Sequence, residues 1–589
     1  MLTRISTLGL FVAFAAVVSG CVPSPWGDGR VFVHVYYVSP TGNDGATGTT
    51  SAAPWQTFAH AFTVMAPGDA LVLEDGIYQE SLAPPPSLSG TPTSHIAIGA
   101  QHDGEAWIDG GGTRIPIDLR GNDYFDIQGI VAFNSGAGVV VLEPDGADHP
   151  TYNTLRRISA YNTAATCTTP GGSVCNHQLF ELWNADHTLI EDCAAAGRAR
   201  SIAYAFQSSY TTWRRCWFRG DQGTGWSPSI ADHDGYASYQ ADHTVFENNI
   251  LADPAPNAFG LAQGIHDWNN VYGGPDTQVN VGNQYFGNVV GSINENGIGI
   301  GATQCKLSRD HVFDNNVVVQ SQNIASAWRR GLAIRLGKNL NVTHLTVIGD
   351  SAGQNGTEQQ GIWVNASVFS DQDPDCSPLD SQGQHYGAWG FYPDTPGGTP
   401  VQHSEFDFTM SITDSVVQGF RVGLEAETAD STPPVIASDH NNVQGNTTNY
   451  LGSAVPGPHD TRVSLRWKTA QYGRGAYLMG ATNAPLGDDG TPVGARVLYE
   501  SENGTTTSTP LWPFPMEDRV WNETGDTSCG RTPTRSTRRT SNRRPGTVRR
   551  STGSCARAAG GGRSTASIRE PARRPVPGPT APIEKGLVS

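Results

Sequence analysis

The stretch Asp186-His187-Thr188-Leu189-Ile190-Glu191-Asp192 decides the fold of this chain, because close copies of it return along the sequence. It comes back as Asp242-His243-Thr244-Val245-Phe246-Glu247-Asn248 and as Asp310-His311-Val312-Phe313-Asp314-Asn315-Asn316. Weaker copies begin at Tyr152, Tyr210 and Asn341. Each full copy is a short β-rich run that ends in Asn or Asp, and none is long enough to form a core alone. Such runs must stack on their neighbours, so the repeat predicts an all-β solenoid.

The spacing of the copies indicates coils of about two dozen residues that carry inserted loops. Thr188 follows Thr154 by 34 residues, and Thr212 follows Thr188 by 24. The recurring Asp-His pairs resemble catalytic dyads, but a feature present in every coil is typical of architecture, here a turn. The asparagines that close the copies predict a ladder along the stack, formed by Asn248, Asn249, Asn315 and Asn316.

Two cysteines, Cys193 and Cys216, occupy matching places in neighbouring copies. We therefore expect them on adjacent coils, either as stacked thiols or as a disulfide.

The region before the copies predicts a helix followed by a first strand. Within residues 55–65, the apolar side chains of Phe58, Phe62 and Met65 fall on one helical face, and Pro54 suits the start. Residues 66–69 read APGD and end the helix, after which Ala70–Leu73 reads as a strand. A helix with one apolar face ahead of stacked strands is expected to cap the open end of a solenoid core.

The same region carries a family resemblance. Residues 36–45 read YYVSPTGNDG and residues 67–78 read PGDALVLEDGIY. With the helix between them, they resemble the start of secreted proteins of the pectate lyase-like superfamily, whose N-terminal cap also occurs in alginate and chondroitin lyase families. The resemblance covers residues 36–135, and it implies a right-handed parallel β-helix with an N-terminal capping helix. The signature motifs of the pectate lyases and of the β-helix polygalacturonases are absent, so no catalytic residue is carried over.

The charge of the chain argues against nucleic acid as a partner. The formal net charge is −17, and basic residues gather after Asp526, so the body before it is more acidic still. An acidic body repels phosphates, whereas a local basic cleft can still hold an anionic polysaccharide. We therefore expect a monomer whose partner is an acidic polysaccharide.

The N-terminus predicts export. Arg4 precedes an apolar stretch at 8–18 that is too short to span a bilayer and is followed by small residues. Val18-Ser19-Gly20-Cys21 resembles the lipobox of bacterial lipoproteins, which implies lipidation of Cys21; the alternative is an ordinary secretory signal. Both predict an oxidising compartment. The lipid form would be anchored in the cell envelope, at the outer membrane or the cell surface.

The composition divides the chain into five predicted parts. A signal at 1–21 and a linker at 22–34 precede the solenoid, which is expected over 35–455. Residues 456–525 lose the repeat and are expected to pack on the solenoid. Residues 526–589 contain no aromatic residue and are rich in Arg, Ser, Thr, Pro and Gly. That composition is typical of a disordered basic tail or of a shifted reading frame.

The scarcity of lysine narrows the search for a catalytic base. Lyases of the superfamily abstract a proton beside a uronate carboxylate, so the resemblance implies a basic residue and a neutralising group, often Ca²⁺. Only Lys306 and Lys338 lie inside the repeat region. Lys338 stands with Arg330 and Arg335 in the densest basic patch, so it is the predicted base and the arginines the predicted neutralising groups. The alternative is a solvated turn whose arginine stems cover apolar surface.

Further charged residues are expected to line the same groove. Substrate-binding residues are predicted two coils earlier, at Arg198, Arg200, Arg214 and Arg215. Ca²⁺ ligands are predicted on a long insert, at Asp221, Asp232 and Asp234. A polar surface loop without a metal is the alternative.

Two hypotheses follow for the function. One is an extracytoplasmic β-helix lipoprotein that cleaves acidic glycans by β-elimination. The other is a non-catalytic surface protein that binds glycan or serves as an adhesin or a spacer, since one fold hosts unrelated functions. Convergence of the predicted residues on one face would favour the lyase.

Overall fold

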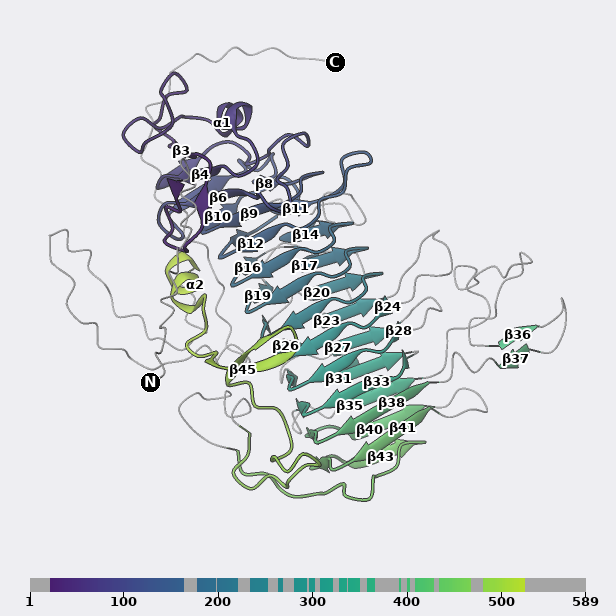
Figure 1. Cartoon of the computed structure of the whole chain (residues 1–589). Coiled ribbons are helices and arrows are strands. Elements are labelled where there is room, and N and C mark those ends of the chain that lie inside the picture. Colours follow the sequence, from purple (N-terminus) through teal and green to yellow (C-terminus); the bar gives the residue numbers. More distant parts are fainter. Residues whose placement is uncertain are drawn as a thin grey trace, which may run out of the picture.

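The chain is a parallel β-helix (Figure 1). The computed structural model describes residues 22–163, 177–197, 199–220, 234–252, 263–268, 280–293, 296–301, 308–320, 328–335, 337–349, 358–365, 391–393, 400–402, 408–427, 434–467 and 480–524. Within these ranges three long parallel sheets run side by side, and a typical coil gives one strand to each. The predicted all-β solenoid is confirmed.

Sheet 1 has 13 described strands. In spatial order they are β3 (Val35–Val38), β4 (Ala70–Leu73), β6 (Ile96–Ala100), β9 (Phe125–Gln128), β12 (Thr154–Arg156), β15 (Leu189–Glu191), β18 (Thr212–Arg214), β21 (Val245–Glu247), β25 (Gln284–Phe286), β29 (Val312–Asp314), β33 (Leu340–Thr343), β38 (Thr409–Thr413) and β41 (Val435–Asp439).

Sheet 2 has 12 described strands. They are β5 (Gly76–Tyr78), β7 (Ala106–Asp109), β10 (Ile130–Phe133), β13 (Ser159–Tyr161), β16 (Ala194–Gly197), β19 (Trp217–Gly220), β22 (Ile250–Ala252), β26 (Val289–Ile293), β30 (Val317–Gln320), β34 (Thr346–Ile348), β39 (Val416–Gln418) and β42 (Asn442–Gln444).

Sheet 3 has 11 described strands. They are β8 (Ile117–Asp118), β11 (Val140–Leu142), β14 (Phe180–Trp183), β17 (Ser201–Phe206), β20 (Asp234–Tyr239), β23 (Gln263–Trp268), β27 (Asn296–Gly301), β31 (Trp328–Arg335), β35 (Glu358–Asn365), β40 (Val422–Glu427) and β43 (Thr448–Gly452).

The remaining described strands form short ladders. One parallel ladder joins β24 (Asn280–Val281), β28 (Ser308–Arg309) and β32 (Gly337–Lys338). Antiparallel pairs join β1 (Val22–Pro23) to β2 (Val31–Phe32), β36 (Phe391–Pro393) to β37 (Pro400–Gln402), and β44 (Tyr499–Glu502) to β45 (Thr505–Pro510).

The predicted helix is present as α1 (Phe58–Val64). The side chain of Thr57 caps it by accepting a hydrogen bond from the amide of His60, and Phe58 and Phe62 are buried. Their rings belong to the same apolar cluster as the inward-facing side chains of the sheets. The helix therefore closes one end of the core, at the top of Figure 1.

Stacked side chains line the turn from sheet 1 to sheet 2. Cys193 and Cys216 are free, buried thiols, and the asparagine ladder continues on the following coils at Asn249, Asn288 and Asn316. Asn248 and Asn315 were predicted in this ladder, but they take the positive φ of the turn and donate to the carbonyls of Tyr499 and Arg496. The side chains of Asn249 and Asn288 each donate to the amide oxygen of the next asparagine, over 3.2 and 3.0 Å. This ladder supplies partners for backbone groups that the turn would otherwise leave unpaired.

Two of the Asp-His pairs lie at the other turn, before sheet 1. His187 and His243 have positive φ, and their rings stack on the ring of Tyr210 from the coil between them, with centroids 4.9 Å apart in both contacts. The pairs are thus part of the turn architecture.

The third Asp-His pair is shifted by one position. Asp310, not His311, takes the positive φ of the turn, because Val312 pairs in register with Gln284, as Val245 does. His311 therefore points into the core, where its Nε2 lies 3.2 Å from the carboxylate of Asp267. Donors from three more side chains satisfy this fully buried carboxylate, those of Asn280, Asn283 and Tyr285.

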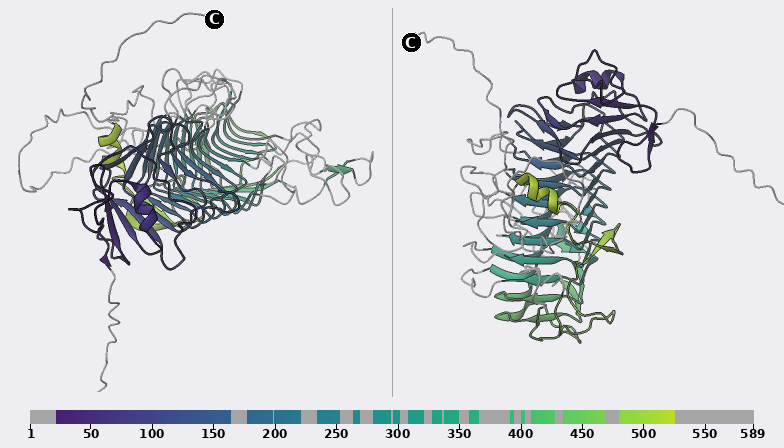
Figure 2. Two further views of the ribbon diagram at one scale, coloured as in Figure 1. Left: turned by 90° about the horizontal axis from the view of Figure 1, so that it is seen from above. Right: turned by 90° about the vertical axis from the view of Figure 1, so that its left-hand side faces the viewer.

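Residues 480–524, which we call the C-terminal strap, return along the outside of the solenoid (Figure 2). The strap ends in α2 (Glu517–Thr524). Arg519 of this helix donates to the carbonyl of Ile130 over 2.9 Å, and Glu523 accepts from the hydroxyl of Tyr161 over 2.5 Å. The end of the strap therefore lies on early coils.

Candidate functional site

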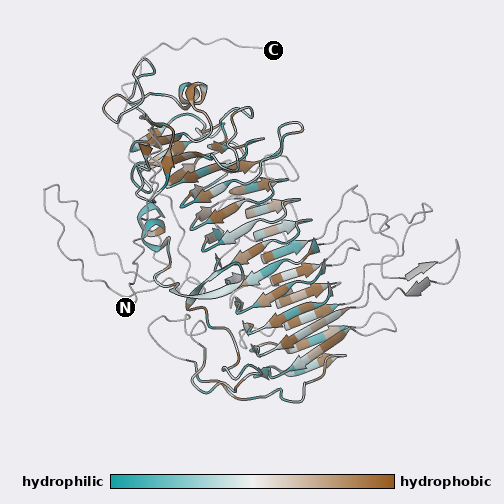
Figure 3. Cartoon of the chain, viewed as in Figure 1, coloured by the Kyte–Doolittle hydropathy of each residue, from teal (hydrophilic) through white to brown (hydrophobic). Residues whose placement is uncertain are grey.

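The outward face of sheet 2 is occupied by the chain itself. Apolar side chains of this face pack in one cluster with apolar side chains of the strap. The cluster includes Tyr161, Trp217 and Ile250 from the sheet, and Leu511 and Phe514 from the strap. In Figure 3 apolar colouring extends over many of the strands. A polymer could not reach sheet 2 without displacing the strap.

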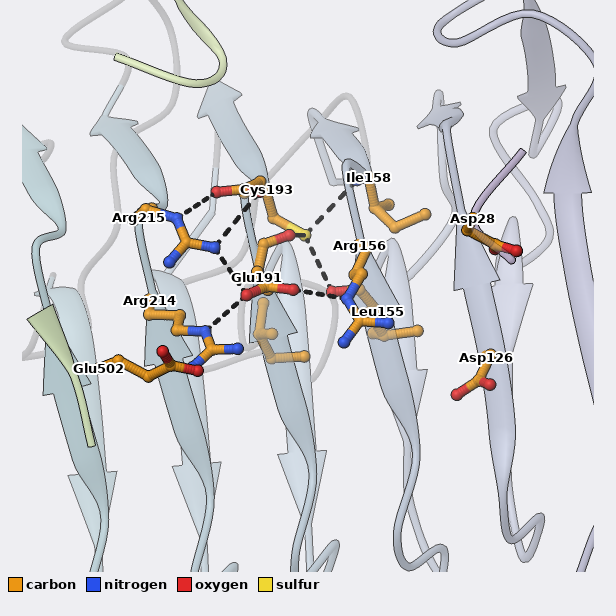
Figure 4. A network of polar contacts seen from close by, with 12 residues as sticks. Asp28, Asp126, Leu155, Arg156, Ile158, Glu191, Cys193, Arg214, Arg215 and Glu502 are labelled. Atoms are coloured by element: carbon orange, nitrogen blue, oxygen red, sulfur yellow. Dashed lines mark hydrogen bonds and ion pairs between the residues drawn. The ribbon is translucent and has the colours of Figure 1, made fainter. Parts of the chain in front are cut away.

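The outward edge of sheet 1 carries charges that neutralise one another. Glu191 accepts from Nε of Arg156 over 2.5 Å and from Nε of Arg214 over 2.6 Å (Figure 4). Arg215 donates to Glu191 over 2.6 Å and to Asp192 over 2.7 Å. Although burial opposes ionisation, these guanidinium groups lower the pKa of Glu191 to about 2. The predicted substrate-binding residues Arg214 and Arg215 are thus held by carboxylates of the chain.

The strands of sheet 3 bend near their start, and this bend, which we call the corner, places the residues before it on the outward face. Ile202 and Ala203 of β17 are consecutive and both belong to the inward core. In later coils the first of these two positions is glycine, at Gly235, Gly264, Gly297, Gly331, Gly361 and Gly423. A Cβ on Gly297 would overlap Val318 of sheet 2 and lie 2.7 Å from the carbonyl oxygen of Gly331. Only glycine allows sheets 2 and 3 to approach this closely.

Gln263, Asn296, Arg330 and Gln360, which each precede one of these glycines, form a polar row on the outward face of sheet 3. Asn296 donates to Gln263 over 3.0 Å, and Nε of Arg330 lies 3.4 Å from Oε1 of Gln360. Gln360 in turn donates to Glu425 over 2.8 Å. The guanidinium carbon of Arg330 lies 3.7 Å from the ring centre of Trp363 on the next coil.

A second set of outward side chains is aromatic. Tyr204 and Tyr239, on adjacent coils, have ring centroids 5.4 Å apart. Tyr239 meets His266 of the following coil edge to face at 5.7 Å. Trp183 and Phe206 pack against each other at 4.7 Å, and Trp183 is 40% exposed. Aromatic rings with polar neighbours are typical of ligand sites.

One carboxyl group at the early end of this face has a strongly shifted pKa. Burial raises the pKa of Glu181 to about 8, and the neighbouring Glu143 carboxylate adds to the shift. Glu181 pairs in register with Tyr204 of the next coil. A carboxyl group with such a pKa exchanges its proton near neutral pH, as general acids and bases do.

The structure brings some of the predicted residues to sheet 3. Arg330 and Arg335 both lie on β31, about 16 Å apart at the usual rise of a strand. Asp234 begins β20 and pairs with Ser201 and Gln263, so its backbone lies in line with the polar row. Arg200 immediately precedes β17.

Lys338 does not lie on sheet 3. It belongs to β32, whose partner is β28, and its carbonyl accepts from the amide of Asp310. The predicted base is therefore separated from Arg330 by the length of β31. Arg198, Asp221, Asp232 and Cys21 lie outside the described residues, and only the backbone is described for Asp234 and Arg335.

His266 and Trp363 were not predicted from the sequence, nor were Gln263, Asn296 and Gln360 of the polar row. A second repeat could have located them, since QGIHD at 263–267, NGIGI at 296–300, RGLAI at 330–334 and QGIWV at 360–364 share a polar residue, glycine and an aliphatic residue.

Two groups of side chains in the described parts of the chain have a spacing suited to a metal ion. They are His344, Asp414 and Asp489, and Asp439, His440 and His459. Neither group coincides with the predicted Ca²⁺ ligands. Within the same parts, no helix combines the length and the apolar character needed to cross a membrane.

No protein-family model and no curated protein matches the chain. Among solved structures, a pectate lyase is 12% identical with a TM-score of 0.33, over 79% of this chain and 97% of that one. The A-module of a mannuronan C-5 epimerase from Azotobacter vinelandii is 12% identical with a TM-score of 0.41, over 72% and 100%. A PL6 family alginate lyase is 11% identical with a TM-score of 0.40, over 77% and 57%. These likenesses concern the fold, and no residue role is taken from them.

Proposed function

We propose that the protein acts on an acidic polysaccharide that lies along the outward face of sheet 3, and that it cleaves this polymer by β-elimination. The observation that carries the proposal is the concentration of aromatic rings, a guanidinium and carboxyl groups on this face. The strap covers sheet 2, and the charged residues of sheet 1 at Glu191 pair with one another. Sheet 3 is thus the face whose side chains suit a glycan.

The spacing of the coils supports a polymeric substrate. Neighbouring strands lie about 4.8 Å apart, so a glycan along the solenoid axis contacts several coils at once. Trp183, Tyr204 and Phe206 offer aromatic surface toward the early coils. Arg330, which is 5% exposed, holds a positive charge four coils further on, in the polar row. Arg330 would hold a uronate carboxylate, because guanidinium groups suit carboxylates in both charge and shape.

The reaction requires a base beside the scissile bond. In β-elimination this base removes the proton next to the uronate carboxylate, and the electron pair expels the glycosidic oxygen, which takes up a proton. His266 and Tyr239 are the proton-transfer pair of the proposal, because their rings meet on adjacent coils. The predicted Ca²⁺ ligands remain a proposal, and no step uses a metal.

One observation favours the second hypothesis, a glycan-binding protein without catalysis. His266 and Gln360 are each only 1% exposed. A polymer would therefore meet the half-exposed aromatic rings before it met these polar groups. Glycan binding requires only contact with these aromatic rings, whereas β-elimination also requires the glycan to reach His266, the proposed base.

The deciding experiment mixes the full chain with pectins, alginates and glycosaminoglycans, with and without Ca²⁺, and follows the absorbance of unsaturated uronates. The proposal expects an absorbance rise that His266→Ala and Arg330→Ala abolish while Lys338→Ala retains it. Loss with Lys338→Ala alone would move the site away from sheet 3. A flat trace together with measurable binding would establish the non-catalytic hypothesis.

The location of the protein is part of the proposal. We infer an extracytoplasmic protein with a lipid anchor at Cys21, on the lipobox resemblance. Mass spectrometry of the mature N-terminal peptide tests it: a diacylglyceryl-modified Cys21 is expected, and an unmodified one would contradict the anchor.

A further inference from the structure

Three segments that are distant in sequence meet at the turn between sheet 1 and sheet 2 near the last coils. His344 and Asp414 both have positive φ there, and they lie on adjacent coils. Asp489 comes from the C-terminal strap, and its Oδ2 lies 3.5 Å from Nε2 of His344. One imidazole and two carboxylates thus meet where the strap crosses the solenoid.

The orientation of the imidazole is set by another carboxylate. Nδ1 of His344 lies 3.3 Å from Oδ1 of Asp314, which also accepts from the hydroxyl of Thr343. A hydrogen on Nδ1 directed at Asp314 leaves the lone pair of the neutral ring on Nε2. A carboxylate on the far nitrogen is the usual second partner of a metal-binding histidine.

The strap holds the other two groups in place. Asp414 is 4% exposed, and its Oδ1 accepts from the amide of Asp488 over 2.8 Å. Asp489 accepts from the amide and the hydroxyl of Thr491 over 2.7 and 2.9 Å. The ligand atoms of His344, Asp414 and Asp489 all lie within 4.8 Å of one another.

We propose that His344, Asp414 and Asp489 bind a divalent transition-metal ion, with Zn²⁺ as the best fit, and that this ion clamps the strap to the last coils. Bonds of about 2.1 Å in a tetrahedral site separate ligand atoms by roughly 3.4 Å, close to the separation of Nε2 and Oδ2. A nitrogen ligand disfavours Ca²⁺ and Mg²⁺, which prefer oxygen. The half-exposed side of Asp489 leaves room for a water as the fourth ligand.

The second group, Asp439, His440 and His459, is a weaker site. Asp439 accepts from the backbone amides of both histidines and lies 3.1 Å from Nδ1 of His459. The two rings stack 4.4 Å apart. Nδ1 of both histidines faces this single carboxylate and the two rings stack on each other, so this group serves as the internal control.

The clamp would act on stability and not on the proposed glycan site. It joins two coils of the solenoid to the segment that covers sheet 2, so the ion binds the folded state and not the unfolded chain. Such an ion raises the melting temperature in proportion to the logarithm of its concentration above the dissociation constant.

The test uses the full chain after treatment with a chelator, and titrates ZnCl₂ by calorimetry and by thermal unfolding. One ion per chain and a melting temperature raised by several degrees are expected. Asp489→Asn and His344→Gln should each weaken binding at least tenfold, whereas Asp488→Asn and His459→Ala should leave it unchanged. Asp489 lies on the exposed side of the strap, so its variant is expected to fold even if the His344 variant does not.

Two results would overturn the proposal. The first is an absence of binding by the unaltered chain, which would mean that a protonated imidazole pairs with these carboxylates. The second is equal binding by Asp489→Asn, which would place the ion elsewhere.

Discussion

The guanidinium carbon of Arg330 lies 3.7 Å from the ring centre of Trp363 on the adjacent coil. Both side chains lie on the outward face of sheet 3, where they are 5% and 3% exposed, and Gln360 approaches Nε of the same guanidinium. A flat cation stacked on an indole is pre-organised to receive a carboxylate, because its conformational freedom is already restricted.

Replacing Arg330 by lysine keeps the charge and removes the planar stack. We expect Arg330→Lys to weaken the binding of an acidic glycan by roughly 5- to 30-fold, equivalent to about 1 to 2 kcal/mol. Calorimetry with the best substrate of the panel measures the change. Arg462→Lys, at an exposed position, is the matched control, and equal affinities for all three proteins would contradict the role of Arg330.

Removing the charge of Glu191 leaves three arginines without their shared partner. Glu191→Gln should lower the free energy of unfolding by about 2 to 3 kcal/mol, because its carboxylate and two of the guanidinium groups are largely shielded from water. Denaturant unfolding measures the loss. Glu502→Gln affects a carboxylate that is 60% exposed and 3.5 Å from Arg214, and should change stability by at most about 0.5 kcal/mol.

The ion pairs of Glu191 also make the stability of the protein depend on pH. The pKa of Glu191 falls from 4.5 to about 2 on folding, so the unfolded chain binds its proton first. The stabilisation is complete above pH 4.5 and is lost as the pH falls toward 2. Glu191→Gln should therefore show a shallower loss of stability over this window. Parallel pH curves for the two proteins would refute this assignment.

The contribution of Glu181 to stability changes with pH in the opposite direction. Burial raises its pKa from 4.5 to about 8, so the folded chain keeps a proton that the unfolded chain releases, and stability falls as the pH rises between these values. Glu181→Gln cannot ionise and should gain stability relative to the unaltered protein over this range, by up to about 1.4 kcal/mol per pH unit. Thermal unfolding at pH 5 and pH 8 checks this, with the exposed Asp148→Asn as control.

Replacing one of the corner glycines of sheet 3 by alanine should disturb the packing between sheets 2 and 3. Gly297→Ala places a methyl group against Val318, so we expect a loss of about 1 to 3 kcal/mol in the free energy of unfolding. The double variant Gly297→Ala with Val318→Ala should lose less stability than the sum of the losses of the two single variants. Strict additivity would show that the two side chains do not meet.

The fold could be predicted from the sequence because the solenoid repeats a local rule. Short β-rich runs recur from coil to coil, several of them closed by Asn or Asp, and each must stack to be buried. The rule also shows where prediction failed. The third Asp-His pair has one residue fewer before its strand, so strand pairing moves His311 from the turn into the core beside Asp267.

The site was harder to predict, because its residues depend on which sheet each strand joins. Lys338 and Arg330 are near in sequence, but β31 and β32 belong to different sheets. Arg214 and Arg215 resemble a cationic groove until the register places Glu191 beside them. The convergence of Arg330 with Trp363 and Glu425 arises from coils that are up to 95 residues apart in sequence, and no local pattern encodes that distance.

The strap has a consequence for the order of events during synthesis. The coils end at Gly452, yet the residues that cover sheet 2 and reach back to Tyr161 come after residue 480. A chain released before that point would expose a continuous apolar stripe along its stacked coils, and such stripes promote self-association. A segment that is synthesised after all the described coils is thus the one that covers the apolar face of the first coils.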